Sequence, residues 1–232
     1  MKKHFLKYII IILLFTGCEK EISDLQKDYF IKMYGTNLRD GSTAILPSSS
    51  GNYIICGTSE TNNNESDVVL FTVDESGNRI SEFNYSGLSG NDRAYSMKRT
   101  GNGFIVSGSI INGEGNHDAM AFTVNNNGEI SGGPESFGGS GNDYAFDIEE
   151  KHDEGYLFVG STQQQGLDLL YIVSLDNNLS GPDVSRNVSG IQARLSKVEK
   201  TNDGEYIAAG TNVLDPVNGY NRFMLTKINR DG

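Results

Sequence analysis

Three short acidic turns recur along the chain and hold the side chains best suited to bind a ligand. Asp40, Asp92 and Asp143 lie about 51 residues apart, and Asn91 and Asn142 directly precede the last two. Carboxylate and carbonyl oxygens are the ligands that Ca²⁺ prefers, and the same groups accept hydrogen bonds from sugar hydroxyls. These five residues are therefore the candidate ligand site, and calcium is the cofactor that they could hold.

The third turn, Gly138–Asp143, reads GGSGND and matches the GGxGxD calcium-binding nonapeptide. That motif binds calcium because successive nine-residue turns stack and share their oxygens. Here the copies are about 51 residues apart, and Ala193 stands at the corresponding place in the fourth copy. We therefore favour a structural interpretation, in which each Asp caps the turn that enters a strand, and we predict no metal site.

The sequence contains no recognisable catalytic group. Glu149 and Glu150 are adjacent, so in a strand they point to opposite faces and cannot flank one glycosidic bond; we expect a solvated strand end. His4, His117 and His152 are isolated, and neither GxSxG nor a phosphate-binding GK[ST] loop is present. We therefore expect no enzyme, with a divergent hydrolase or lyase as the alternative.

The elements that position these residues form a repeat. Apolar segments that begin with an aromatic residue and end in Gly recur with the glycines 51, 52 and 50 residues apart: Tyr53–Gly57, Phe104–Gly108, Tyr156–Gly160 and Tyr206–Gly210. A second apolar segment ending in Asx follows each of them: Val68–Val73, Ala119–Val124, Leu170–Leu175 and Phe223–Ile228. A shorter alternating strand precedes each aromatic segment, and a fourth extended segment lies between copies: Tyr29–Tyr34, Ser81–Tyr85, Glu135–Phe137 and Ser185–Val188.

Four short strands every 50 residues or so are typical of a β-propeller blade. The sequence predicts an all-β propeller over residues 28–232, with four four-stranded blades at about 28–80, 81–130, 131–180 and 181–232. The segment Tyr29–Tyr34 would pair with Phe223–Ile228, so that the N-terminal strand closes the last blade. The alternative is an open arc of a longer repeat array. Cys56 lies within the first aromatic segment, where we expect a buried, inert thiol.

The N-terminal residues predict where the protein is located in the cell. Residues 1–17 contain a basic start and a continuous apolar run, which together indicate a secretory signal peptide. Thr16-Gly17-Cys18 resembles the lipobox of bacterial lipoproteins, although Phe15 stands where that family usually has Leu. The resemblance implies acylation of Cys18 by a lipid such as palmitate. Residues 18–27 would be the lipidated tether of an outer-membrane protein at the cell surface.

The repeats resemble those of surface lipoproteins from Bacteroides-like bacteria, with a consensus near FGGSGxDxAxxI, then DGGYIxxG. The residues that carry the resemblance are Phe137, Gly138, Gly139, Asp143, Ala145, Ile148, Gly155, Tyr156, Gly160, Leu175 and Asp176. The resemblance implies a propeller fold and a cell-surface context, and it transfers no catalytic residue.

The charge of the chain restricts its partners. The net charge of −11 becomes −14 from Cys18 onward, because residues 1–17 carry three lysines and no acid. So acidic a surface repels phosphate backbones, and we expect no nucleic acid partner. We expect a monomer, anchored to the membrane by its lipid, that acts as a non-catalytic binding or scaffold module for an extracellular glycan or protein. A purely structural envelope component is a further alternative. The longest loops, Ser59–Ser66, Ile110–His117 and Val213–Asn221, would mark the binding face.

Overall fold

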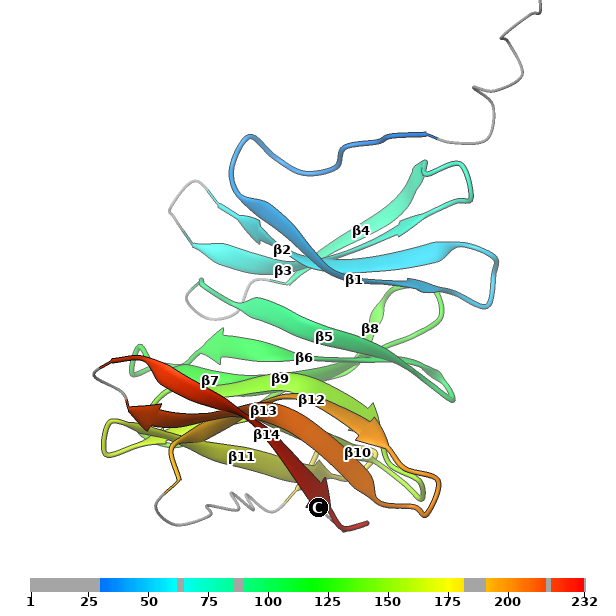
Figure 1. Ribbon diagram of the computed structural model, residues 1–232. Coiled ribbons are helices and arrows are strands. Elements are labelled where there is room, and N and C mark those ends of the chain that lie inside the picture. The colour runs from blue at the N-terminus through cyan, green and yellow to red at the C-terminus, as the bar shows by residue number, and fades with distance from the viewer. Residues whose placement is uncertain (1–29, 62–64, 86–89, 182–190, 216–217, 232) are drawn as a thin grey trace, which may run out of the picture. The chain divides into compact units, whose positions relative to one another are not determined.

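The computed structural model describes residues 30–61, 65–85, 90–181, 191–215 and 218–231. The chain divides into two units, Met1–Met33 and Tyr34–Gly232, and all fourteen strands lie in the second (Figure 1). No helix occurs in the described ranges, so nothing there could cross a membrane as a helix. The predicted signal peptide, Cys18 and the tether lie outside the described residues.

The strands form four antiparallel sheets in chain order. The first sheet contains β1 (Asp40–Pro47), β2 (Tyr53–Glu60), β3 (Ser66–Val73) and β4 (Arg79–Tyr85). The second contains β5 (Arg93–Thr100), β6 (Gly103–Ile111), β7 (His117–Val124) and β8 (Ile130–Phe137). The third contains β9 (Asp143–Glu150), β10 (Tyr156–Gln164) and β11 (Leu167–Leu175). The fourth contains β12 (Ala193–Lys200), β13 (Tyr206–Asp215) and β14 (Tyr220–Ile228).

This architecture confirms the all-β class and the four repeated sheets, which resemble propeller blades. Two expectations concern the outer strands, and one of them is not tested. The segment Ser185–Val188, expected to complete the third sheet, lies outside the described residues. Phe30–Tyr34 form no strand, and β14 pairs with β13 alone among the described strands, so closure of a ring stays a prediction. Tyr34 instead donates a hydrogen bond to the carbonyl of Gly77 and packs its ring 5.1 Å from that of Phe71 in β3.

The repeated glycine is explained by a bulge in the first strand of every sheet. Each first strand contains one extra residue that has no partner in the second strand: Thr43, Tyr95, Phe146 and Ser196. The bulge brings a main-chain carbonyl of the first strand against the glycine that ends the aromatic motif. A Cβ atom at Gly57, Gly108, Gly160 or Gly210 would clash with that carbonyl. The glycine is therefore required by close backbone approach.

The hydrophobic core is divided among the junctions of consecutive sheets. One cluster joins the first and second sheets, another the second and third, and another the third and fourth. Cys56 lies fully buried in the first cluster, which confirms the expected burial, and desolvation raises the pKa of its thiol to about 12. A thiol with so high a pKa stays protonated at neutral pH and is a poor nucleophile.

Polar contacts on the first strands link neighbouring sheets at the repeat distance. Thr43 in β1 donates a hydrogen bond to the carbonyl of Ala94 in β5 over 2.8 Å. The buried carboxylate of Asp147 in β9 accepts from the hydroxyl of Ser96 in β5, and also from the amide of Val198 in β12 over 3.0 Å. One side chain thus connects three consecutive sheets.

We predict that Asp147→Ala lowers the free energy of unfolding by about 3 kcal/mol, because a buried hydroxyl and a buried amide lose their acceptor. Urea unfolding of residues 19–232 measures the change. The control is Asp153→Ala, which removes an exposed ion pair with Arg230 and should change the stability little. Equal effects of the two substitutions would contradict the role given to Asp147.

Candidate functional site

The starts of the four first strands lie at the same end of the sheets as the loops between the second and third strands. The registers place Asp40 opposite Ser59, Arg93 opposite Ser109, Asp143 opposite Thr162 and Ala193 opposite Asn212. We call this end of the sheets the mouth. The predicted ligand residues and the described parts of the long loops are therefore at the same end.

Asp40 and Asp143 make the same hydrogen bond to the main chain. Each accepts from the amide of the residue four positions earlier, Thr36 or Gly139, over 2.7 Å. Asp40 also accepts from the hydroxyl of Ser59 over 2.5 Å, and these hydrogen bonds, that of Ser59 first, lower the pKa of its carboxyl. This geometry is that of a turn cap, the structural interpretation favoured from the sequence.

The other predicted ligand residues also have roles in the turns and main-chain contacts at the mouth. Asp92 is fully buried and accepts from the amide of Ile111 over 3.1 Å, while Asn91 adopts a φ of +76° in the turn before β5. Asn142 accepts from the amide of His117 over 3.0 Å, which ties the β6–β7 loop to the start of β9. In the described ranges no group of three or more His, Cys, Asp or Glu side chains is placed to hold a metal ion. A ligand role for the five residues stays a prediction.

The β6–β7 loop is the long loop that the structure describes in full. The side-chain oxygen of Asn112 accepts from the amides of Glu114 and Asn116 and so folds the loop on itself. The side-chain amide of Asn116 then donates to the carbonyl of Ser140 over 3.1 Å. The loop is therefore held against the GGSGND turn, and residues 62–64 and 216–217 of the other two long loops lie outside the described residues.

Four rings gather beside this loop, and the sequence reasoning did not identify them. Tyr95 comes from the bulge of β5, Tyr144 and Phe146 from β9, and His117 from the start of β7. The ring centroids are 5.3 Å apart for Tyr95 and Phe146, 5.6 Å for Tyr144 and Phe146 and 5.4 Å for His117 and Tyr144. We call these four residues the aromatic group. All four residues are half-buried.

The bulges explain why these rings meet. Tyr95 and Phe146 are the extra residues of β5 and β9, and a bulge turns such a side chain away from the regular alternation. In the sequence, Tyr95 and Phe146 each lie one residue after the alanine that begins the shorter alternating strand, and this shared position was the signal that could have identified them. Without the register, however, that position is indistinguishable from a core position. The nearly parallel rings of Tyr144 and Phe146, with 12° between their planes, present the flat apolar surface on which a sugar ring can stack.

Burial sets the electrostatics of the aromatic group. Desolvation raises the pKa of Tyr144, so its hydroxyl stays protonated and can donate a hydrogen bond. Desolvation, with the nearby charge of Arg93, lowers the pKa of His117. The neutral imidazole is therefore the favoured form at neutral pH, and the site as a whole combines uncharged rings with hydroxyl and amide groups.

The acidic residues of β9 correct one expectation. Glu149, expected to be solvated, is buried and forms an ion pair with Lys98 of β5 over 2.7 Å. Burial raises the pKa of its carboxyl, and Lys98 opposes that rise. Two positions earlier, Asp147 lies 3.4 Å from the ammonium of Lys197. Both carboxylates thus have cationic partners on neighbouring sheets.

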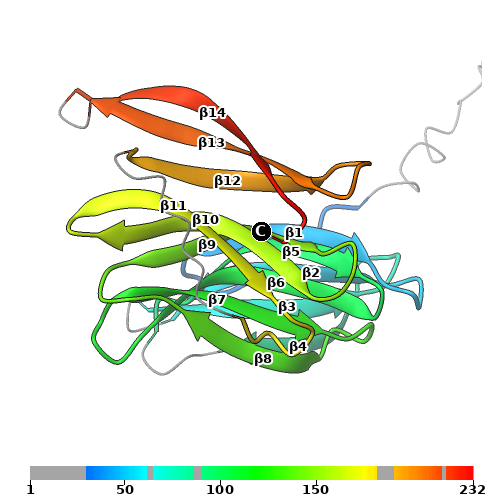
Figure 2. The same ribbon diagram turned by 90° about the horizontal axis from the view of Figure 1, so that it is seen from below.

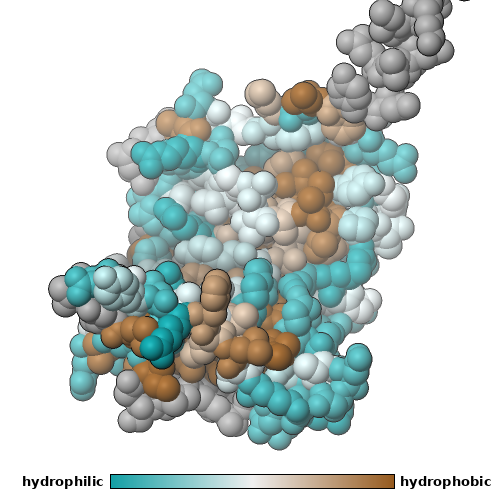
Figure 3. Space-filling model, in the orientation of Figure 1, coloured by the Kyte–Doolittle hydropathy of each residue, from teal (hydrophilic) through white to brown (hydrophobic). Residues whose placement is uncertain are grey.

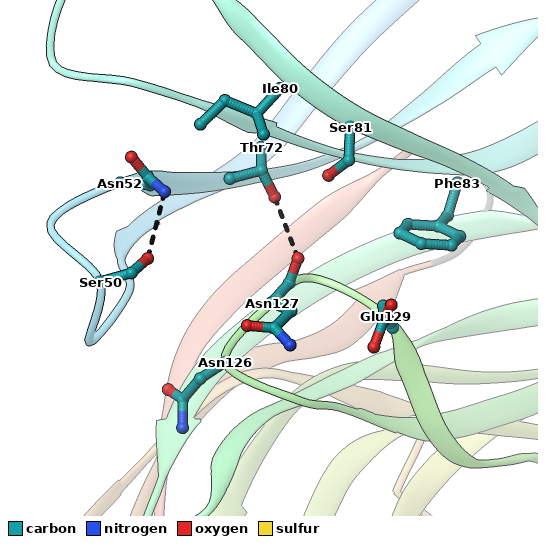
Figure 4. A pocket seen from close by; sticks show the side chains of 9 residues that line it. All are labelled: Ser50, Asn52, Thr72, Ile80, Ser81, Phe83, Asn126, Asn127 and Glu129. Carbon is teal, nitrogen blue, oxygen red and sulfur yellow. Dashed lines mark hydrogen bonds between the residues drawn. The ribbon is translucent and has the colours of Figure 1, made fainter.

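A pocket with both polar and apolar lining lies at the opposite end of the sheets, between the first and second sheets (Figure 4). Its volume is about 340 Å³, at the lower end of the range of ligand pockets. The lining residues are Ser50, Asn52, Thr72, Ile80, Ser81, Phe83, Asn126, Asn127 and Glu129. Thr72 donates to the main-chain carbonyl of Asn127 over 3.4 Å across the pocket.

No protein-family model and no curated protein sequence matches the chain. Among solved structures, a protein of Bifidobacterium bifidum s17 described as a proposed exo-beta-1,3-galactanase has a TM-score of 0.52 at 12% identity. The match covers 80% of this chain and 66% of that one, so the chain spans just under two thirds of its length. An endo-arabinase of Bacteroides thetaiotaomicron VPI-5482 has a TM-score of 0.42 at 13% identity, with 79% and 73% covered. At these identities the galactanase match supports the fold alone.

We predict that stability falls as the pH drops below about 6.5, and that His117 contributes to the fall. Its pKa is depressed in the folded state, so its contribution is fully present above the unfolded value of 6.5 and is lost as the pH falls toward the folded value. The free energy of unfolding, measured with urea at pH 7.5 and 5.5, should fall less between these pH values for His117→Gln than for the wild type. If the free energy of unfolding of His117→Gln fell as much between the two pH values as that of the wild type, the prediction would be contradicted. The matched control is His152→Gln, which lies away from the aromatic group.

Proposed function

We propose that this chain binds a glycan at the mouth, through the aromatic group, without acting on it chemically. The single observation that carries the proposal is the gathering of Tyr95, Tyr144, Phe146 and His117, half-buried, beside a loop of amide side chains. Carbohydrates are recognised by rings that stack on their apolar faces and by nearby groups that hydrogen-bond their hydroxyls. The fold similarity to a proposed galactanase is consistent with such a role.

The absence of catalysis is part of the proposal. A glycosidase uses one protonated and one ionised carboxyl group that flank the bond. The acidic side chains of β9 closest to this arrangement, Asp147 and Glu149, have Lys197 and Lys98 as partners. Asp147 also accepts hydrogen bonds from Ser96 and Val198, so the contacts of both carboxylates join neighbouring sheets, which suits a structural role.

In the proposed setting the protein is a lipoprotein of the outer membrane, anchored through Cys18, with its mouth exposed at the cell surface. An anchored binding module of this kind retains an extracellular glycan near the cell, and the acidic surface repels nucleic acid. A protein ligand at the same mouth is the second possibility that the sequence left open, and the stacked rings favour a sugar.

The test is a glycan array probed with residues 19–232, with and without calcium, followed by calorimetry on the best ligand and on β-1,3-linked galacto-oligosaccharides. We expect binding that is independent of calcium. Tyr144→Ala should weaken it about tenfold or more, since a stacked ring contributes on the order of 1 kcal/mol beyond its buried area. Tyr53→Ala, at a partly exposed position at the opposite end of the sheets, is the matched control and should bind as the wild type does.

Other outcomes would reject parts of the proposal. A strictly calcium-dependent ligand would move the site to Asp40, Asp92 and Asp143. Release of reducing ends from the bound glycan would favour the hydrolase alternative. Wild-type affinity in both Tyr144→Ala and Phe146→Ala would exclude the aromatic group as the binding surface.

A further inference from the structure

Each junction between consecutive sheets is built from two kinds of face. One sheet contributes side chains of its second and third strands that point toward the next sheet along the chain. We call these side chains the forward face of that sheet. In the first sheet these are Ile54, Cys56, Val68 and Leu70. The following sheet contributes those that point to the sheet before it, its rear face. In the second sheet these are Phe104, Val106, Met120 and Phe122.

The third sheet repeats both faces. Its rear face, with Tyr156, Phe158, Tyr171 and Val173, packs in the cluster shared with the second sheet. Its forward face, with Leu157, Val159, Leu170 and Ile172, packs in the cluster shared with the fourth sheet, and none of these four side chains is more than 7% exposed. A forward face on a rear face is therefore the junction that this chain makes three times.

The forward face of the fourth sheet is not covered by any of the residues that the structure describes. Ile207 and Ala209 lie opposite Lys227 and Leu225, and Thr211 lies opposite Phe223, so these side chains share one face of the sheet. Ile207 is 38% exposed, Leu225 68% and Phe223 fully exposed, whereas the equivalent residues of the third sheet are buried. Figure 2 shows β14 at the outer margin of the sheets, and Figure 3 shows apolar side chains gathered over the β13–β14 hairpin.

The first sheet has the complementary face, which the described residues cover only in part. Tyr53, Ile55, Val69 and Phe71 occupy the rear-face positions, and their equivalents in the second sheet are at most 1% exposed. Here Tyr53 is 38% exposed and the other three are half-buried, with Tyr34 and Arg79 over the ring of Phe71. Next to Val69 on this face lies Asp67, near Asp92 and Glu65, while the forward face of the fourth sheet carries Arg194 at its mouth end.

We propose that the forward face of the fourth sheet docks on the rear face of the first sheet in a second copy of this chain. The contact continues the junction that joins the sheets within the chain, and at the mouth end it brings Arg194 of the forward face toward Asp67 of the rear face. A second copy offers both faces, so two copies satisfy each other reciprocally and form a closed head-to-tail pair. The free apolar surface at each end is thereby removed from water.

The test uses one charged substitution on each face: Leu225→Glu on the forward face and Ile55→Glu on the rear face. By light scattering, wild-type residues 19–232 should have twice the mass of one chain. Each single variant should be monomeric, with a dissociation constant raised at least about tenfold. A mixture of the two variants keeps one intact forward face and one intact rear face, so the mixture should form a one-to-one pair again.

Recovery in the mixture distinguishes head-to-tail contact from every other occupant. A wild-type monomer, as intrachain closure of the ring would give, overturns the proposal. So does a dimer that survives both substitutions, or two monomeric variants that fail to associate when mixed. Leu167→Glu, an exposed position at the β10–β11 hairpin, is the matched control and should remain a dimer. Tyr53→Glu, on the more exposed rear-face residue, replaces Ile55→Glu if circular dichroism shows that the latter is unfolded.

Discussion

The close approach of a bulged first strand to a glycine in the second strand is the constraint on which the other features of the sheets depend. It occurs in all four sheets, with Thr43, Tyr95, Phe146 and Ser196 as the extra residues. A side chain on the glycine would separate the two strands, because a carbonyl of the first strand occupies that space. The bulge increases the local twist of the strand and redirects one side chain in every repeat.

The same backbone device therefore supports two different roles. In the first sheet the redirected residue is Thr43, which donates to the carbonyl of Ala94 and links the sheet to its neighbour. In the middle sheets the redirected residues are Tyr95 and Phe146, and they meet in the aromatic group. The repeated backbone fixes where the side chain is directed, and the residue type decides whether the side chain joins two sheets or enters the aromatic group. This division lets a repeat keep its fold while one or two copies acquire a site.

The sequence predicted the repeat, the strand order within each copy and the glycines, because apolar alternation and turn residues are local signals. It also led to the cap role favoured for the acidic turns, which the hydrogen bonds of Asp40 and Asp143 match. The aromatic group could not be predicted, because rings on β5, β7 and β9 meet through registers and bulges that no local pattern encodes. Glu149 was misjudged for the same reason: its partner Lys98 is about one repeat away, on another sheet.

The two ends of the array differ in how their apolar faces are covered. In a repeat array each unit packs on its neighbours, so the first and last units need a polar or covered outer face to remain soluble. The first sheet is partly covered, because Tyr34 packs on Phe71 and the guanidinium of Arg79 lies over both rings. The fourth sheet has no such cover in the described residues, and Phe223 is fully exposed on its edge strand β14. The forward face of the fourth sheet is built like the forward faces of the earlier sheets. Its exposed side chains occupy the positions that the earlier junctions bury.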